Sequence, residues 1–236
     1  MALLSSLLFN LIFYGGTSVL AFALLPLMLS RNGASWAGRI WGRYCNLCCQ
    51  IIGLSYQLKG DMAADRQVIY AVKHQSAWET MVLYDVLGAP LVVLKKELLR
   101  LPVIGQFMQR AGVVAINRAA GVSSLRQMKS EAHKAVASQR SVLIFPQGTR
   151  VAAGAKAPYH SGVYMLYQHM GLPVIPVALN AGMFWGRAAW KKQRGMITVD
   201  FLPAIPPGLE RREFMSQLES MIETRTSQLE DEVRQR

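Results

Sequence analysis

The chain has 236 residues and a formal net charge of +12 at pH 7, and 52% of its residues are hydrophobic. This length suits one substantial domain, and no Ser/Gly/Pro-rich linker divides the chain into two. The basic excess lies in residues 1–206, which suits an anionic partner such as membrane headgroups, a phosphorylated substrate or an acidic carrier protein. Nucleic acid is excluded as the expected partner, because no nucleic-acid-binding module accompanies the charge.

An uncharged apolar segment opens the chain and covers residues 2–30. As a helix of about 28 residues it is roughly 42 Å long, which exceeds the roughly 30 Å hydrocarbon core of a bilayer. A secretory signal peptide is disfavoured, because no Lys or Arg precedes Arg31. Gly15-Gly16 and Pro26 are points where a straight helix can break, so a membrane span and a helix that dips into one leaflet both remain open.

Arginine residues follow this segment at Arg31, Arg39 and Arg43. The positive-inside rule places such a flank, and with it the rest of the chain, on the cytoplasmic side of the membrane. Residues 35–53, in which tryptophans and other apolar residues alternate with these arginines, predict a second helix. Two interpretations of this helix remain open: it lies at the headgroup level of the bilayer, or it packs against the main domain.

Three cysteines, Cys45, Cys48 and Cys49, are crowded into this second helix. A structural zinc site usually needs four ligands, and the four histidines of the chain supply no second pair at the required spacing. We therefore interpret the cysteines as small apolar residues on a helix face and expect no metal site.

Short apolar runs alternate with helical patterns after residue 53. The predicted strands are 67–72, 90–94, 113–116, 141–145, 174–179 and 196–201, and the predicted helices are 77–87, 103–110, 122–138, 163–169 and 211–233. This alternation predicts an α/β fold with a central mixed β-sheet flanked by helices. We expect N-terminal membrane-associated helices, forming a hairpin, over residues 1–55 and one catalytic domain over 56–236, with functional residues in the loops beyond the strand ends.

The first polar cluster runs from Lys73 to Thr80, directly after a predicted strand. His74 and Glu79 are five residues apart, a spacing that on one regular helix separates two side chains by about 140°. Contact between them requires His74 in the strand-to-helix loop and Glu79 in the first turns of the helix. A carboxylate on one imidazole nitrogen fixes the tautomer and leaves the other nitrogen as a base. By itself this spacing is a weak signal, because most such pairs are structural.

A second cluster follows the predicted strand 141–145 and reads Phe145-Pro-Gln-Gly-Thr-Arg150. Gly148 permits a close approach of the backbone to a ligand, and Arg150 offers a planar fork for a phosphate group. An ordinary strand-end turn with a solvated arginine is the alternative interpretation.

Two further clusters are less specific. The strand that begins at Val113 ends in Asn117-Arg118, and Lys95 and Lys96 follow another strand. Lysines at such positions are able to bind an anion, but most surface lysines are simply solvated.

In their identity and order these clusters resemble the motifs of the glycerolipid acyltransferase family, and most closely those of its 1-acyl-glycerol-3-phosphate acyltransferases. That family has an H-x-x-x-x-D block, a strand that ends in N/D-R, an F-P-E-G-T-R block and a late V-P-V-type strand. The matching blocks here are His74 to Glu79, Ile116-Asn-Arg118, Phe145-Pro-Gln-Gly-Thr-Arg150 and Val174-Ile-Pro-Val177. The resemblance covers residues 67–180 and implies the fold of that family.

Two positions depart from the family pattern. Glu79 replaces the usual Asp and keeps the charge on a side chain one methylene longer. Gln147 replaces the usual Glu, and its amide accepts a hydrogen bond but cannot neutralise a neighbouring arginine. We therefore expect a more positive local field, which suits either tighter phosphate binding or a different acceptor headgroup.

The resemblance implies that His74 removes the proton from the sn-2 hydroxyl of 1-acyl-glycerol-3-phosphate, with Glu79 orienting the ring. The alkoxide attacks a thioester of coenzyme A or acyl carrier protein, giving phosphatidic acid in phospholipid synthesis. It implies no metal and no bound cofactor, and as partners a lysophospholipid, the acyl thioester and membrane lipids. The residues that it implies for substrate binding are Lys95, Lys96, Arg118, Gln147, Gly148, Thr149 and Arg150.

Two other functions are compatible with parts of the sequence. One is acylation of a different lysolipid, such as a lyso-aminolipid. The other is a non-catalytic membrane adaptor that binds anionic lipid through its basic body, but this function leaves the His-Glu block and the Pro-Gln-Gly-Thr-Arg block unexplained.

Overall fold

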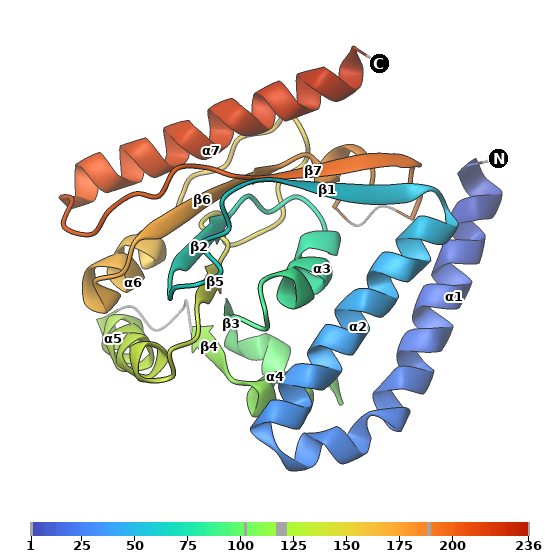
Figure 1. The fold of residues 1–236 in the computed structure, drawn as a ribbon, viewed down its shortest axis with the longest axis horizontal. Coiled ribbons are helices and arrows are strands. Elements are labelled where there is room, and N and C mark those ends of the chain that lie inside the picture. The colour runs from blue at the N-terminus through green and yellow to red at the C-terminus, as the bar shows by residue number, and fades with distance from the viewer. Residues whose placement is uncertain (1, 102, 117–121, 188–189, 236) are drawn as a thin grey trace.

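The computed structural model describes residues 2–101, 103–116, 122–187 and 190–235. An N-terminal pair of helices precedes a sheet whose strands are connected mainly by helices (Figure 1). The helices are α1 (Ala2–Ala23), α2 (Arg31–Ile51), α3 (Trp78–Val86), α4 (Ile104–Ala111), α5 (Val122–Ala137), α6 (Gly162–Met170) and α7 (Arg211–Arg234), with 3-10 turns η1 (Leu25–Leu29), η2 (Lys96–Arg100) and η4 (Ala181–Met183). The strands are β1 (Leu54–Gly60), β2 (Ile69–Val72), β3 (Leu91–Lys95), β4 (Val113–Ile116), β5 (Val142–Ile144), β6 (Val174–Leu179) and β7 (Gly195–Phe201).

The apolar N-terminal segment is not one helix. Helix α1 ends at Ala23, and the 3-10 turn η1, with Pro26 in its first turn, reverses the chain into α2. The Ser30 side chain accepts a hydrogen bond from the Gly33 amide at 2.9 Å and caps α2. Of the two predicted break points, the proline is therefore used, whereas Gly15-Gly16 lies inside a continuous helix. The predicted helical hairpin is confirmed.

The described strands form one mixed sheet of seven, in the order β1-β7-β6-β2-β5-β3-β4. Strands β6, β2, β5, β3 and β4 run parallel, and β7 is antiparallel to β6 and parallel to the outer strand β1. The predicted α/β fold with a mixed sheet is thus confirmed. Strand β1 was not predicted, although Leu54, Tyr56 and Leu58 alternate with polar residues there; only Leu54 of its seven residues is buried.

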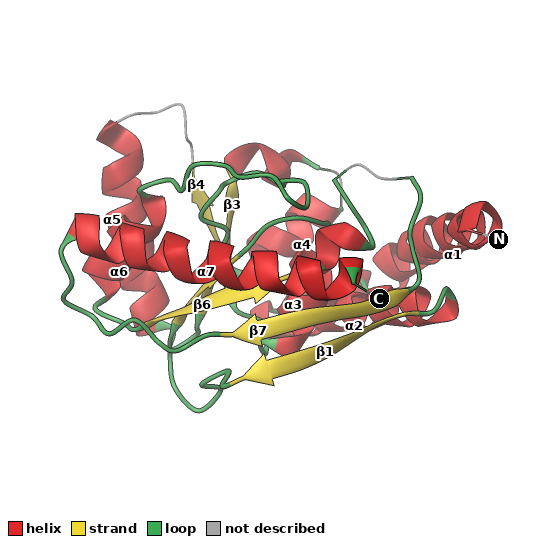
Figure 2. Cartoon of the chain, turned by 90° about the horizontal axis from the view of Figure 1, so that it is seen from above, coloured by secondary structure: helices red, strands yellow, loops and turns green. Residues whose placement is uncertain are grey.

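Helices cover both faces of the sheet (Figure 2). Helices α2 and α3 lie on one face, and α5, α6 and α7 lie on the other (Figure 1). Strand β2 serves both layers, because successive side chains point to opposite faces. Tyr70 and Val72 belong to the core on the α2 and α3 side, whereas Ile69 and Ala71 belong to the core on the α5, α6 and α7 side.

Helix α1 shares the core of the main domain. Phe9 and Phe13 are buried and pack edge-on against Trp185. Lys192, only 3% exposed, lies over the Phe9 and Trp185 rings and donates a hydrogen bond of 2.7 Å to Asn10. These contacts hold the first half of α1 against the body.

Helix α2 packs against α3 and α4. Arg39 and Arg43 donate to the two carboxylate oxygens of Asp85 on α3, at 2.8 and 2.9 Å, whereas Trp36 remains 52% exposed. The interpretation that this helix packs against the main domain is therefore confirmed, whereas its position at the headgroup level of a bilayer stays a prediction. The three cysteines are buried in the core, as their interpretation as small apolar residues predicts.

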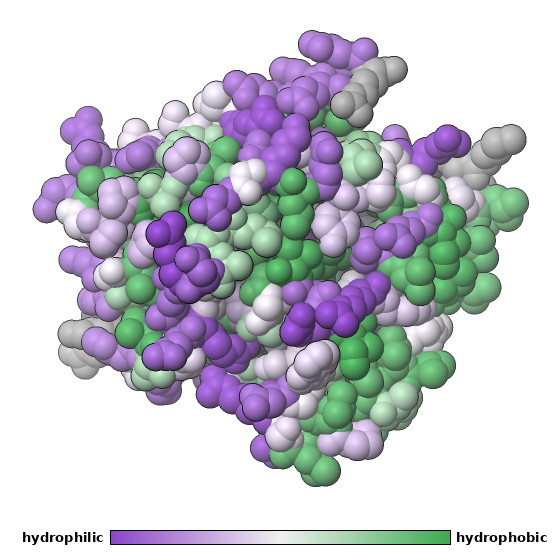
Figure 3. All heavy atoms as spheres, viewed as in Figure 1, coloured by the Kyte–Doolittle hydropathy of each residue, from purple (hydrophilic) through white to green (hydrophobic). Residues whose placement is uncertain are grey.

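One face of the N-terminal hairpin is exposed and apolar. Green, apolar side chains gather over α1 at the right of Figure 3, whereas α7 along the top is mostly hydrophilic. Within the part of the chain that the structure describes, the helical segment Leu4–Ala23 is long and apolar enough to cross a membrane, and most of it is not buried inside the protein. The exposed apolar side chains of α1 include Leu4, Leu7, Leu8, Leu11, Val19 and Phe22.

Candidate active site

His74 lies in the loop that joins β2 to α3, at the carboxyl end of a parallel strand. The alternation of β2 continues into this loop. Lys73 and Gln75 make their side-chain contacts with α7, whereas the His74 ring lines a cavity on the opposite side of the sheet. Successive side chains of this extended segment thus alternate: His74 faces the cavity, and Lys73 and Gln75 face α7.

Glu79 is the second residue of α3, and its side chain meets His74 as predicted. Its Oε1 lies 2.9 Å from His74 Nδ1 and accepts the Gln75 and Ser76 amides at 2.7 and 2.6 Å. Because an ionised carboxylate only accepts hydrogen bonds, His74 Nδ1 is the donor, and in the neutral imidazole the lone pair then lies on Nε2. Three N–H donors on one oxygen stabilise negative charge at a fully buried carboxylate, whose Oε2 has no hydrogen-bond partner among the residues that the structure describes.

The turn after β5 fixes the backbone and the ring of His74. The His74 amide donates to the Gln147 side-chain oxygen at 3.0 Å, and the His74 carbonyl accepts from the Val151 amide at 2.8 Å. The imidazole stacks on Phe145, with ring centroids 4.0 Å apart. The segment with the Pro-Gln-Gly-Thr-Arg sequence therefore holds the histidine from three directions.

Sequence reasoning missed a buried charged cluster behind this loop. The Lys73 ammonium, 1% exposed, contacts both oxygens of Glu223 on α7 at 2.7 Å. The same carboxylate accepts from Gln147 at 3.3 Å and from the Tyr159 hydroxyl at 2.9 Å. Burial and the neighbouring Glu223 raise the pKa of Tyr159 above its ordinary value, so the phenol remains a donor. No local pattern signals this cluster, because Lys73 and Glu223 lie 150 residues apart.

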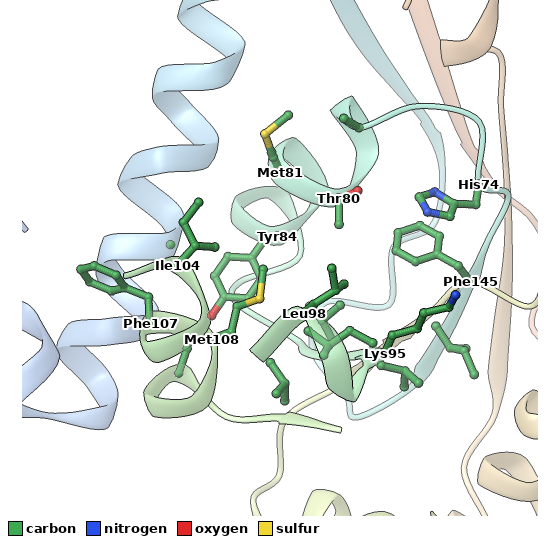
Figure 4. A pocket seen from close by; sticks show the side chains of 18 of the residues that line it. His74, Thr80, Met81, Tyr84, Lys95, Leu98, Ile104, Phe107, Met108 and Phe145 are labelled. Atoms are coloured by element: carbon green, nitrogen blue, oxygen red, sulfur yellow. The ribbon is translucent and has the colours of Figure 1, made fainter. Parts of the chain in front are cut away.

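An apolar cavity of about 720 Å³ extends from His74 toward the N-terminal hairpin. His74 and Phe145 lie at one end in Figure 4, and Ile104 and Phe107 lie at the other. The wall between them comes from α1, α2, α3, β3 and α4, and it is mostly apolar. Its members include Thr17, Leu20, Trp41, Met81, Tyr84, Leu94, Leu98 and Met108.

The predicted substrate-binding residues differ in their placement. Lys95, Gly148 and Arg150 line the cavity, and the Lys95 side chain points toward the His74 end (Figure 4). Lys96 and Thr149 are exposed and are not part of the cavity wall. Arg118 lies outside the residues that the structure describes.

Two of the predicted substrate-binding residues, Gln147 and Gly148, form hydrogen bonds to other protein groups. Gln147 is 1% exposed, and both ends of its amide contact protein groups rather than the cavity. Gly148, with φ +63°, donates its amide to the Phe145 carbonyl at 2.9 Å, which makes that N–H part of the turn. Glu223 places a carboxylate beside the Gln147 amide, but this carboxylate is paired with Lys73, so the expected more positive field at Gln147 stays a prediction.

The arrangement is suited to general-base catalysis at the mouth of an apolar cavity. A histidine with one nitrogen held by a carboxylate is able to take a proton through the other nitrogen. The arginine and lysine at the same end provide charge for an anionic group. An apolar cavity with a few polar groups converging at one end is typical of an enzyme active site.

The family model described as Acyltransferase matches residues 54–180. The chain therefore belongs to the acyltransferase family, and it is an enzyme of that class.

Named relatives agree with this family. The 1-acyl-sn-glycerol-3-phosphate acyltransferase of Pseudomonas aeruginosa is 31% identical over 188 residues, which cover 79% of this chain and 73% of that protein. The human 1-acyl-sn-glycerol-3-phosphate acyltransferase beta is 31% identical over 143 residues, which cover 60% and 51%. A crystal structure of the 1-acyl-sn-glycerophosphate (LPA) acyltransferase from Thermotoga maritima has a TM-score of 0.78 at 18% identity, covering 100% of this chain and 99% of that chain. The two chains share their fold.

Proposed function

We propose that the chain transfers a fatty acyl group from an acyl thioester to the sn-2 hydroxyl of 1-acyl-glycerol-3-phosphate, giving phosphatidic acid. The observation that carries this proposal is the His74–Glu79 pair at the polar end of the apolar cavity, with Arg150 on the same wall. The names of the relatives favour this acceptor, since they are described as acyltransferases of 1-acyl-sn-glycerol-3-phosphate.

The chemistry follows from the geometry of the pair. His74 Nε2 takes the proton of the acceptor hydroxyl, and the resulting alkoxide attacks the thioester carbonyl. Collapse of the tetrahedral intermediate breaks the C–S bond, and the His74 proton passes to the leaving thiolate. Glu79 stabilises the imidazolium between these two transfers. The substrate hydroxyl is itself the nucleophile, so this sequence uses no acyl-enzyme, metal or bound cofactor.

Charge and hydrophobicity divide the substrates between the two ends of the site. Arg150 and Lys95 bind the acceptor phosphate through charge-assisted hydrogen bonds. Arg118, which lies outside the described residues, is assigned to the same role from the family motif alone. An acyl chain fills the apolar cavity toward Ile104 and Phe107. The thioester carrier is coenzyme A or acyl carrier protein.

The protein acts at a membrane with its catalytic domain on the cytoplasmic face. The exposed apolar side of α1 enters the bilayer, and the cavity that leads to His74 is lined by residues of α1 and α2, which brings it next to the membrane. Arg31, Arg39 and Arg43 follow α1, and a basic flank of this kind lies on the cytoplasmic side. In this proposal residues 1–55 attach the catalytic domain, 56–236, to the membrane.

Thiol release from acyl-CoA and from acyl carrier protein, measured with and without lysophosphatidic acid, tests the reaction. The wild type should release thiol rapidly only when the acceptor is present. Arg150→Ala should raise the acceptor KM by about tenfold or more and change the thioester KM less, because one charged hydrogen bond to the phosphate is lost. Arg212→Ala, which removes an exposed arginine on α7, is the matched control and should leave both KM values unchanged.

Three results would contradict the proposal. Faster turnover of a lyso-aminolipid in direct competition would replace the acceptor. Vesicle binding without thioester consumption would indicate a non-catalytic adaptor. An unchanged acceptor KM in correctly folded Arg150→Ala would remove this arginine from the phosphate site.

A further inference from the structure

Helix α7 carries two carboxylates that face the His74 loop, the partly buried Glu223 and the buried Glu230. Glu223 and Glu230 are seven residues apart, which places them on the same side of the helix two turns apart. Glu223 binds Lys73, and Glu230 accepts from the Gln75 side chain at 2.7 Å. The residues immediately before and after His74 are therefore both held by α7, on the side of the sheet opposite the cavity.

The Glu223 carboxylate also determines how the Gln147 amide is oriented. A carboxylate accepts hydrogen bonds and donates none, so Gln147 has to turn its NH2 group toward Glu223. Its carbonyl oxygen then faces the His74 amide and accepts from it at 3.0 Å. The negative charge of Glu223 thus orients the Gln147 carbonyl oxygen, which accepts the hydrogen bond from the His74 backbone amide.

The buried ammonium of Lys73 makes this charge necessary. Lys73 is 1% exposed, and a buried ammonium is stable only beside a counter-charge. Glu223 contacts it through both oxygens, and its side chain is only 15% exposed. Because Lys73 directly precedes His74, this ion pair ties the chain beside the histidine to α7.

We propose that Glu223 is a positioning residue for His74 and carries, from helix α7, the negative charge that the neutral Gln147 does not provide. Glu230 completes the same support through Gln75. This role rests on the proposed function, in which His74 is the base. It adds a requirement that the family motifs do not contain: the turnover of this enzyme depends on a carboxylate in the C-terminal helix.

Moving the charge between the two side chains tests the proposal. Glu223→Gln removes the counter-charge of Lys73 and the constraint on the Gln147 amide. Gln147→Glu alone places two carboxylates against each other, which disfavours the ionised state of one of them. In the double variant the charge lies on residue 147, where it accepts from the His74 amide and from the amide of residue 223. The remaining oxygen of residue 223 still accepts from Lys73, whereas the Tyr159 hydroxyl loses its carboxylate acceptor.

The measurements are kcat, both KM values and the folded fraction of each variant in the thiol-release assay. We expect Glu223→Gln to lower kcat per folded enzyme by about 10- to 100-fold, since small displacements of a catalytic group have effects of this size. The KM values should change by less than about threefold, because Glu223 lies away from the cavity. The double variant should recover to within about fivefold of the wild-type kcat. Glu219→Gln, the matched control, removes an exposed carboxylate one turn earlier on α7 and should have no effect.

Each outcome decides the proposal. A kcat of Glu223→Gln equal to that of Glu219→Gln, once normalised to folded enzyme, would show a merely structural role and overturn it. A double variant that is no better than Glu223→Gln would also overturn it. If Glu223→Gln does not fold, the double variant must fold and turn over, and its failure counts against the proposal. A wild type without acyl transfer to any lysolipid contradicts the proposed function instead, so the two failures are distinguishable.

Discussion

At the scale of single residues, the loop from His74 to Glu79 is organised around one carboxylate oxygen. Glu79 Oε1 accepts hydrogen bonds from the His74 ring and from two backbone amides. It therefore fixes both the tautomer of the base and the shape of its loop. The unpaired Oε2 is buried, so the longer Glu side chain fits here without a second partner. The two roles of Glu79 lead to different expectations for its substitutions.

His74→Ala should lower kcat by about 10²–10⁴-fold, the usual scale of general-base catalysis, while folding is retained. Glu79→Gln should also impair turnover, because its oxygen still accepts the three donors but its buried NH2 group lacks an acceptor and the imidazolium loses its counter-charge. Glu79→Asp should regain part of this loss, since it restores the carboxylate at a shorter reach. The measurement is kcat of the purified single variants.

The double variant of His74→Ala and Glu79→Gln distinguishes a catalytic pair from two independent residues. Residues that act as a unit give a combined loss far smaller than the product of the single losses. Losses that multiply, or near-normal turnover of His74→Ala, would mean that another group is the base.

At the scale of secondary-structure elements, the close contact between α2 and α3 positions the helix that carries Glu79. Gly42 of α2 is buried against the backbone of α3, and a Cβ at this position would lie 2.6 Å from the Met81 carbonyl oxygen. The Arg39 and Arg43 contacts with Asp85 lie along the same interface. The glycine therefore sets the distance between the N-terminal hairpin and the active-site helix.

Gly42→Ala should destabilise the protein by about 1–3 kcal/mol, the typical effect of overpacking against a backbone that cannot move freely. Gly15→Ala is the control, because an added Cβ there meets no atom within 4 Å and alanine favours the helix. Urea unfolding in the same detergent measures both free energies. Equal stability of the two variants would show that α2 can move away from α3 without cost.

At the scale of the whole molecule, the exposed apolar side chains and the buried ones lie on the same helix. The first half of α1 is attached to the body through Phe9, Phe13 and Lys192, whereas Leu11 and Phe22 are 74% and 67% exposed. A helix with one side in the protein core and the other side free suits attachment along a bilayer surface or within one leaflet.

Leu11→Ser combined with Phe22→Ser should lower the partition coefficient onto phosphatidylglycerol-containing vesicles by about tenfold or more, because burial of one such side chain contributes about 1.5–3 kcal/mol. Val136→Ser is the control, since Val136 is an exposed apolar residue on α5, across the sheet from α1. Vesicle flotation at low and high salt measures the effect. Equal binding of the two variants would place the membrane contact outside α1.

Local sequence patterns predicted most strands and helices after residue 60. They also gave the condition under which His74 and Glu79 meet, which the five-residue loop between β2 and α3 fulfils. The break at Pro26 was also a candidate from the sequence, since proline lacks the amide that continues a helix. These features depend on residues close together in the chain. The resemblance of the ordered motifs to a family supplied the expected chemistry.

The tertiary structure alone decided which distant groups complete the site. The pairing of Lys73 with Glu223, the edge position of β1 beside β7, and the cavity between the hairpin and the domain depend on contacts between remote segments. Such contacts leave no periodic or motif signal, because any of several acidic residues on α7 looks equivalent in the sequence. The packing of α7 on β6 selects Glu223, since it places this carboxylate behind the loop where the buried ammonium requires a counter-charge.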